Sequence, residues 1–245
     1  MRTQQSVWTC PKKEEESLRQ PLRTQVKSLE RHPLDQASMS SGCQSDLMNA
    51  ALAAVNVPLH YAQKGKNLVL ASMAGAKQGV YLAHYPEKDV VDRVHHTRFY
   101  YHSHRHPSQE HGHFHIFVND QEPGGFMHLA ALSLSPRGEP VRWFSTNAWV
   151  TGERMPSALE MIGKLDSFQI QTHGRLAPIA RWLTAMVQLF SPQLIQMLKR
   201  RDIVMQRRST SQTWTALCED RRLDVLSQCS ASLPKRIQQF QQRGF

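Results

Sequence analysis

Residues 98–118 read RFYYHSHRHPSQEHGHFHIFV, and this stretch decides the fold expected for the chain. Aromatic residues and histidines alternate on both sides of a short polar segment, residues 105–110, which contains Pro107 and Ser108. Alternation with a period of two is typical of a β-strand, and two such runs around a short polar segment predict a β-hairpin. The predicted strands are residues 98–104 and 111–118.

The predicted hairpin separates histidines from other aromatic and apolar residues, because successive side chains of a strand point to opposite faces. One face carries five imidazoles: His102, His104, His111, His113 and His115. The register pairs His104 with His111, His102 with His113, and Tyr100 with His115. The other face can be buried in a core and carries Phe99, Tyr101, Phe114 and Ile116.

Five imidazoles on one face are hard to explain as packing, because each needs hydrogen-bond partners and each can become charged as the pH falls. Cross-strand Cβ atoms lie ~4.5–5.5 Å apart, so imidazoles from two strands can converge on one divalent ion. The five histidines therefore predict a mononuclear metal site. Zinc, iron, nickel and copper all accept imidazole, and histidines with one carboxylate suit catalytic zinc or non-haem iron(II). Glu110 is the predicted general base or additional ligand, and Glu153 is a weaker candidate. His128, on the next predicted strand, is a candidate to hydrogen-bond a metal ligand if that strand neighbours the hairpin, and is otherwise a core or surface histidine.

Three functions stay open at this level. The first is a metalloenzyme, either a metal-dependent hydrolase or a non-haem iron oxygenase, which activates water or oxygen for an unidentified small-molecule substrate. The second is a metal-binding sensor or store without catalytic activity. The third needs no metal: residues 111–118 resemble the motif of the histidine-triad nucleotide hydrolases and transferases, in which one histidine attacks a phosphorylated substrate. Gly112 stands where that motif has a large apolar residue.

The rest of the sequence predicts an α+β fold, with N-terminal and C-terminal helices around a central antiparallel sheet. Turns with proline and glycine separate two further strands, residues 126–135 and 140–146. Ser157 has the capping-box spacing to Glu160, and Ser191-Pro192 is typical of a helix start. Helices are expected at 47–55, ending near Pro58, at 179–189 and at 191–207, and Pro234 is expected to begin a last helix. Residues 68–83 are expected to form a helix that leads into a short strand. Residues 222–229 are expected to form a strand.

The domain prediction is a flexible leader over residues 1–43, followed by one α+β domain over residues 44–245. Within this domain the histidine-rich sheet spans about 95–150 and the helical C-terminal part about 157–245. The leader is assigned because Gln, Ser, Lys and Glu dominate it without sustained periodicity.

Composition limits the partners. The chain has 245 residues with 30 Lys and Arg against 20 Asp and Glu, a net charge of +10, and its basic excess lies in the C-terminal third. The short basic clusters there predict solvated helix faces, and nucleic-acid binding is the less favoured alternative. Neither a membrane span nor a secretory signal is predicted. A cytoplasmic location follows as an expectation, with Cys10, Cys43, Cys218 and Cys229 reduced. The sequence does not indicate an oligomeric state.

Two motifs together resemble a family of uncharacterised bacterial proteins: the histidine-rich residues 100–104 and 110–115, and the later Thr-Asn-Ala-Trp-Val-Thr-Gly-Glu of residues 146–153. The resemblance extends over about residues 80–230 and leaves out the first 40 residues. His106 is not part of the pattern. The resemblance implies a bacterial protein and carries no established activity.

Overall fold

The structure, a computed structural model, describes residues 41–74, 84–103, 110–120 and 125–242. Its centre is a six-stranded antiparallel sheet with the strands in sequence order, β1 to β6. The strands are β1 (His84–Asp92), β2 (Thr97–Ser103), β3 (Gly112–Asn119), β4 (Phe126–Leu134), β5 (Pro140–Thr146) and β6 (Val225–Ser230). Helices precede and follow the sheet, so the fold is α+β, as predicted.

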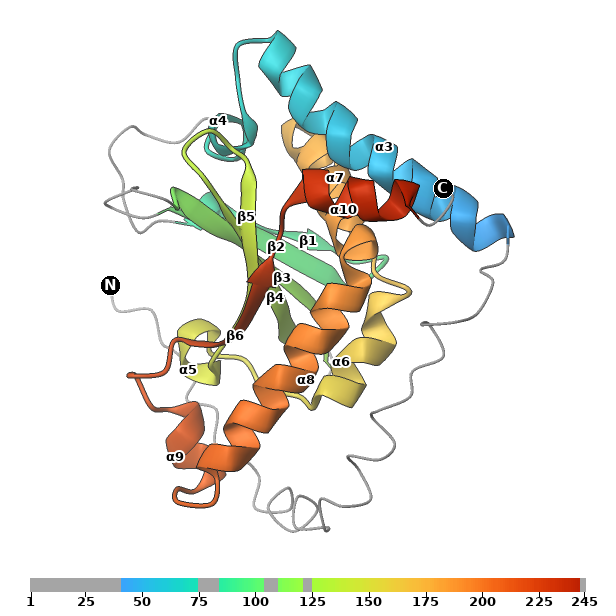
Figure 1. Ribbon diagram of the computed structural model, residues 1–245. Coiled ribbons are helices and arrows are strands. Elements are labelled where there is room, and N and C mark those ends of the chain that lie inside the picture. The colour runs from blue at the N-terminus through green and yellow to red at the C-terminus, as the bar shows by residue number, and fades with distance from the viewer. Residues whose placement is uncertain (1–40, 75–83, 104–109, 121–124, 243–245) are drawn as a thin grey trace.

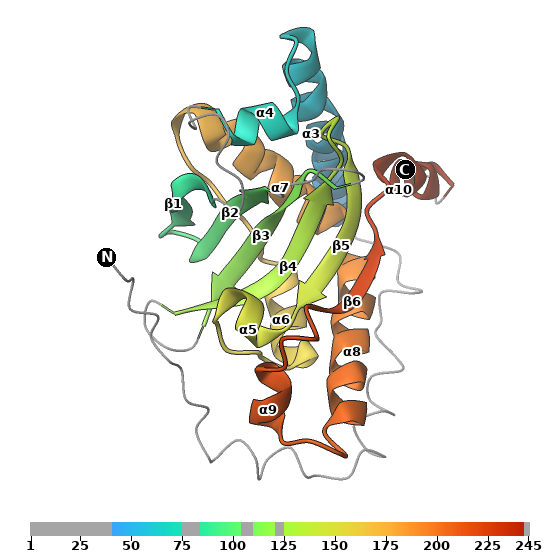
Figure 2. The same cartoon turned by 90° about the vertical axis from the view of Figure 1, so that its left-hand side faces the viewer.

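Eight helices accompany the sheet in the described part of the chain. They are α3 (Ser41–Gln63), α4 (Leu68–Ser72), α5 (Ala148–Thr151), α6 (Ala158–Leu165), α7 (Ala177–Leu189), α8 (Ser191–Arg208), α9 (Trp214–Cys218) and α10 (Leu233–Gln241), with a 3₁₀ turn at Gly174–Leu176. Helices α6, α7 and α8 lie behind the sheet in Figure 2, and α3 packs on the outer side of α7 (Figure 1). The opposite face of the sheet is free of these three helices. In the described part of the chain, no helix has the length and apolarity needed to cross a membrane.

The hairpin prediction is confirmed in its register. Tyr100 pairs with His115 and His102 pairs with His113 across β2 and β3. Residues 104–109 lie outside the described residues, so the predicted pairing of His104 with His111 is not described.

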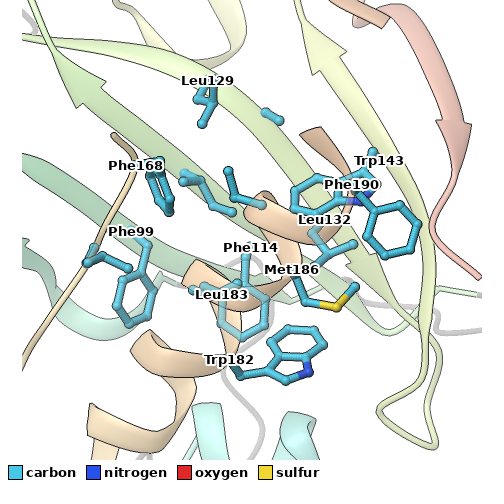
Figure 3. Close-up of a cluster of buried hydrophobic side chains, with 14 of the residues drawn as sticks. Phe99, Phe114, Leu129, Leu132, Trp143, Phe168, Trp182, Leu183, Met186 and Phe190 are labelled. Atoms are coloured by element: carbon cyan, nitrogen blue, oxygen red, sulfur yellow. The ribbon is translucent and has the colours of Figure 1, made fainter. Parts of the chain in front are cut away.

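The predicted apolar face of the hairpin is buried beneath the helices. Phe99, Tyr101, Phe114 and Ile116 are all buried in the main core. The ring of Phe114 lies 6.1 Å from the ring of Trp182 of α7, centroid to centroid (Figure 3). Because this face is held by the helices, the alternate side chains of the same strands must lie on the other face.

The first helix is longer than predicted, because α3 continues through Pro58 instead of ending near it. Proline has no N–H to donate, so within a helix it leaves the carbonyl four residues earlier without its backbone partner. That carbonyl belongs to Ala54, and the indole Nε1 of Trp182 donates to it at 3.2 Å. A side chain of α7 thus replaces the missing backbone hydrogen bond.

Other boundaries also differ from the prediction. The sequence predicted only a short strand without bounds after the helix in residues 68–83, whereas β1 has nine residues, and the sheet begins at residue 84 instead of about 95. The predicted helix 68–83 is only the short α4, and residues 75–83 lie outside the described residues. Residues 41–43 of the predicted leader begin α3, while residues 1–40 are likewise outside the described part. The N-cap prediction is confirmed, since Ser157 Oγ accepts from the Glu160 N–H at 3.2 Å.

Candidate functional site

Four neighbouring strands place five imidazoles on the sheet face that lies away from helices α6 to α8. The residues are His84 of β1, His102 of β2, His113 and His115 of β3, and His128 of β4. Their order follows from the register, since His84 pairs with His102 and His102 with His113. The structure thus brings together three of the predicted ligands and adds two histidines that the ligand prediction did not include.

Three of these rings form a continuous hydrogen-bonded series with a carboxylate at one end and a hydroxyl at the other. Glu110 Oε1 lies 2.8 Å from His113 Nδ1, and the two Nε2 atoms of His113 and His115 lie 2.9 Å apart. His115 Nδ1 lies 3.0 Å from His128 Nε2, and His128 Nδ1 lies 3.1 Å from Thr146 Oγ1. We call the series Glu110–His113–His115–His128–Thr146 the histidine row.

The carboxylate fixes the direction of every hydrogen bond in the row when the three rings are neutral. An ionised carboxylate can only accept, so the proton of His113 sits on Nδ1 and its Nε2 accepts. The proton of His115 must then sit on Nε2, and its Nδ1 accepts from His128 Nε2. Thr146 therefore donates its hydroxyl proton to His128 Nδ1, and all donors point towards Glu110.

Burial keeps the inner rings neutral. The side chains of His115 and His128 are buried on this face. Burial, with smaller contributions from nearby histidines, holds the pKa of His115 well below its ordinary value. Burial also lowers the pKa of His128 to about 3, helped by the positive charges of His113, Arg201 and Arg98. Neither ring carries a charge at neutral pH.

Glu110 lies at the rim of the row and contacts Arg142 as well as His113. Its second oxygen, Oε2, accepts from Arg142 Nη2 at 3.1 Å. Burial alone would raise the pKa of Glu110, but the hydrogen bonds and charges of His113 and Arg142 outweigh it and lower the pKa. An ionised carboxylate with one oxygen on His113 and one on Arg142 is arranged to orient the imidazole.

The predicted ligand His111 lies apart from the row. It precedes β3, and its Nδ1 lies 3.0 Å from the hydroxyl of Tyr101, a residue of the buried core face. Gly112, between His111 and His113, has no room for a side chain, because a Cβ there would lie 2.2 Å from the carbonyl oxygen of His102. His104, the fifth predicted ligand, lies outside the described residues.

On the far side of His113 the remaining rings continue across the sheet. The centroids of His102 and His113 are 5.4 Å apart, and those of His84 and His102 are 5.7 Å apart. The ring of His84 stacks on Tyr100 at 4.0 Å with an interplanar angle of 13°. Burial lowers the pKa of His84 below its ordinary value.

The other end of the row borders a small cavity of about 10 Å³, the size that one water molecule needs. Its lining includes His128, Thr146, Glu153 and Arg201. Glu153, the weaker candidate, pairs with Arg98 through Oε1, and its buried Oε2 has no hydrogen-bond partner among the described residues.

Cys218 and Cys229 lie away from the histidine row. Cys218 packs in a small cluster with Leu217, and Cys229 belongs to β6.

Within the described residues, no three or more His, Cys, Asp or Glu side chains lie in an arrangement that could hold a metal ion as they stand. The two Nε2 atoms of His113 and His115 instead face each other as a hydrogen-bonded pair, 2.9 Å apart.

Residues 48–231 match a family model described as "Domain of unknown function (DUF6969)", and the chain belongs to this family. The match agrees with the predicted membership of an uncharacterised family and assigns no activity. No curated protein and no solved structure matches the chain.

Proposed function

We propose that the protein binds a divalent metal ion between Nε2 of His113 and Nε2 of His115 and acts there as a metalloenzyme on a small molecule. One observation carries the proposal: the two Nε2 atoms face each other at 2.9 Å, while the far nitrogen of each ring is held by another side chain. We place this activity in the cytoplasm of a bacterium, as the sequence predicts.

The partners of the far nitrogens match what metal-binding histidines need. A ligating imidazole nearly always uses its second nitrogen to hydrogen-bond a carboxylate, a carbonyl or another acceptor, which fixes the ring and raises its basicity. Glu110 supplies the carboxylate for His113, and His128 contacts the second nitrogen of His115. We therefore assign Glu110 to orienting His113, in place of the predicted role as general base or ligand.

His102 is the nearest source of a third ligand. Its ring centroid lies 5.4 Å from that of His113 and 6.4 Å from that of His115. A site with two or three imidazoles keeps coordination positions for water and substrate, as catalytic zinc and non-haem iron sites do. The ion would supply Lewis acidity and lower the pKa of bound water.

The proposal is tested by the metal content and affinity of the full chain, purified without an affinity tag. Titration calorimetry with Zn²⁺, and with Fe²⁺ under anaerobic conditions, should show one site per chain. His113→Ala and His115→Ala should each weaken metal binding at least ~10-fold. Even the loss of a residue that only hydrogen-bonds a metal ligand usually lowers the affinity by ~10-fold or more. His173→Ala is the matched control, because this exposed histidine lies before α7, away from the row. Equal affinity of the parent and both row variants would contradict the proposal.

The two other sequence hypotheses make different predictions for the same protein. A sensor or store needs a closed ligand shell, so the absorption spectrum of the Co²⁺ form should show no water that azide or cyanide can replace. The histidine-triad hypothesis needs no metal, and its motif fits poorly, because Gly112 leaves no space for the large apolar residue of that motif.

A further inference from the structure

We propose that a second cavity, separate from the histidine row, binds a small amphipathic anion, which is an apolar chain or ring with one carboxylate or phosphate group. The cavity has a volume of about 570 Å³, and small-molecule sites typically have volumes of ~300–1,000 Å³. None of its lining residues belongs to the histidine row, so the inference does not depend on the metal proposed there.

Three separate segments form the walls of this cavity. The first runs from the end of α3 to the start of α4 and contributes Leu59 and Ala62, the second is the β4–β5 turn, and the third is the start of α10 with Leu233. In Figure 2, α4, the β4–β5 turn and α10 lie in the upper half of the molecule, at the opposite end from α9.

Direct contacts join the first two walls, so they hold their relative position without a ligand. Asn67 Nδ2 donates to the carbonyl of Pro136 at 3.3 Å, and Asn67 Oδ1 also accepts from the Leu70 N–H at 2.9 Å. Gly138 has a φ of +81°, and a Cβ there would lie 2.9 Å from the backbone nitrogen of Leu68. Glycine allows both this φ and this close approach of the turn to α4.

Most of the cavity lining is apolar. Leu59 has 51% of its surface exposed, although leucine gains free energy when it is buried. An apolar ligand body in the cavity would cover part of this surface. The apolar lining residues include Pro58, Leu59, Ala62, Leu68, Leu233 and Pro234.

Two cations at the cavity favour an anionic ligand. Lys66 and Arg137 are exposed, and neither makes a hydrogen bond or an ion pair with another described residue. Glu139 is the carboxylate among the described lining residues, and it accepts from Ser135 Oγ at 3.5 Å. Two cations and one carboxylate leave a net charge of +1. The start of α10 adds partial positive charge, since the Ser232 side chain makes no capping hydrogen bond there.

The position of these cations beside an apolar lining selects one class of ligand. Carboxylates and phosphates are the groups that arginine binds best, because their oxygens match the guanidinium geometry. An anion without an apolar body would leave Leu59 in water, and an apolar molecule without a charge would leave Lys66 and Arg137 without a partner.

Calorimetric titration of the full chain with decanoate tests the proposal, with a chelator present and below the concentration at which decanoate forms micelles. One decanoate per chain should bind saturably. Decylammonium, which has the same chain length and the opposite charge, should bind roughly fivefold more weakly or not at all, because exposed ion pairs contribute little more than this factor. Decyl phosphate is titrated in parallel, and the tighter of the two anions identifies the preferred head group. Equal affinity for decanoate and decylammonium, or no saturable binding of either anion, would overturn the proposal.

Substitutions in the lining locate the bound anion. Lys66→Gln and Arg137→Gln should each weaken decanoate binding about two- to fivefold, the range for one exposed ion pair. Arg207→Gln is the matched control, because this exposed cation of α8 lies outside the lining. Ala62→Phe should fill the cavity and weaken binding roughly tenfold, a cost similar to that of overpacking. Gln63→Phe adds the same ring at the next exposed residue, outside the lining, and should bind as the parent does.

Each variant is first checked for the urea unfolding midpoint of the parent, so that a lost fold is not mistaken for a lost site. Folded Ala62→Phe protein with the affinity of the parent would overturn the proposal. Losses in Lys66→Gln and Arg137→Gln no larger than the loss in Arg207→Gln would also overturn it, since binding would then follow the net charge of the chain instead of this cavity.

Discussion

The carboxylate of Glu110 holds the ring of His113 by Nδ1 and leaves Nε2 directed at His115. Glu110 therefore sets the orientation of the first ring, and the orientation of each further ring in the histidine row depends on the ring before it. Arg142 of β5 anchors Glu110 on its other oxygen, so residues from a loop and two strands set the geometry of one imidazole.

Glu110→Gln should weaken zinc binding about tenfold, the lower end of the range for lost partners of metal ligands. The amide oxygen can still accept from His113, but the negative charge that raises the basicity of the imidazole is lost. The affinity is measured by competition with a chelating dye. Glu139→Gln, on the exposed β4–β5 turn, is the matched control and should bind as the parent does. A Glu110→Gln protein with unchanged affinity would contradict the assigned role.

The hairpin and its histidine face could be predicted because local alternation decides them. His102 and His113 pair as expected, since a slip of one residue would have sent Phe114 and Ile116 away from the helices. No comparable pattern surrounds His84, which lies on an edge strand rich in charged residues. Its place beside His102 follows only from the pairing of β1 with β2.

The histidine row could not be predicted, because it depends on a register shift and on side-chain geometry. The pairing of β3 with β4 shifts between Ile116 and Phe117, and this irregularity sets His128 opposite Phe117. The contact of His128 with His115 therefore depends on an irregular pairing between two strands that no sequence period encodes. The continuation of α3 through Pro58 was missed for a similar reason. The hydrogen bond that Pro58 cannot donate to the Ala54 carbonyl comes from Trp182, which lies 128 residues later in the sequence than Ala54.

Gly112→Ala should destabilise the protein by about 3 kcal/mol, the upper end of the usual cost of overpacking. The added Cβ would lie 2.2 Å from a backbone oxygen of β2, so a strand must move rather than a flexible side chain. Gly163→Ala in α6 is the matched control, because a Cβ there meets nothing within 4 Å. It should stabilise the protein by ~0.5–1 kcal/mol, the helical preference of alanine over glycine. Urea denaturation of both variants measures the difference, and equal effects would refute the steric argument.

Trp182→Phe should cost more stability than Trp143→Phe, although both indoles are fully buried. Trp182 Nε1 serves the carbonyl of Ala54, whereas Trp143 Nε1 is buried without a partner among the described residues. Both substitutions remove a similar volume. Only Trp182→Phe leaves a buried carbonyl without its hydrogen-bond donor, which adds ~1–3 kcal/mol to the loss in unfolding free energy. Pro58→Ala restores a backbone donor to Ala54, so the cost of Trp182→Phe should shrink in that background. Equal unfolding free energies for the two tryptophan variants would contradict this account of α3.

The metal-free protein should lose stability as the pH falls from about 6.5 towards 5, because two buried histidines resist protonation. The pKa of His115 lies well below its ordinary value and that of His128 is about 3, so between this pH and ~6.5 the unfolded chain binds protons that the folded chain does not. Stability therefore rises with pH across this window, with a slope of up to ~1.4 kcal/mol per pH unit for each such histidine. The carboxylate of Glu110, whose pKa is lowered, contributes in the same direction only near and below its ordinary pKa, at more acid pH.

His128→Gln removes one titrating group and should flatten the curve by up to ~1.4 kcal/mol per pH unit. Urea denaturation of both proteins in the presence of a chelator, at several pH values across the window, provides the measurement. Parallel stability curves for the parent and the variant would show that His128 is not held neutral in the fold.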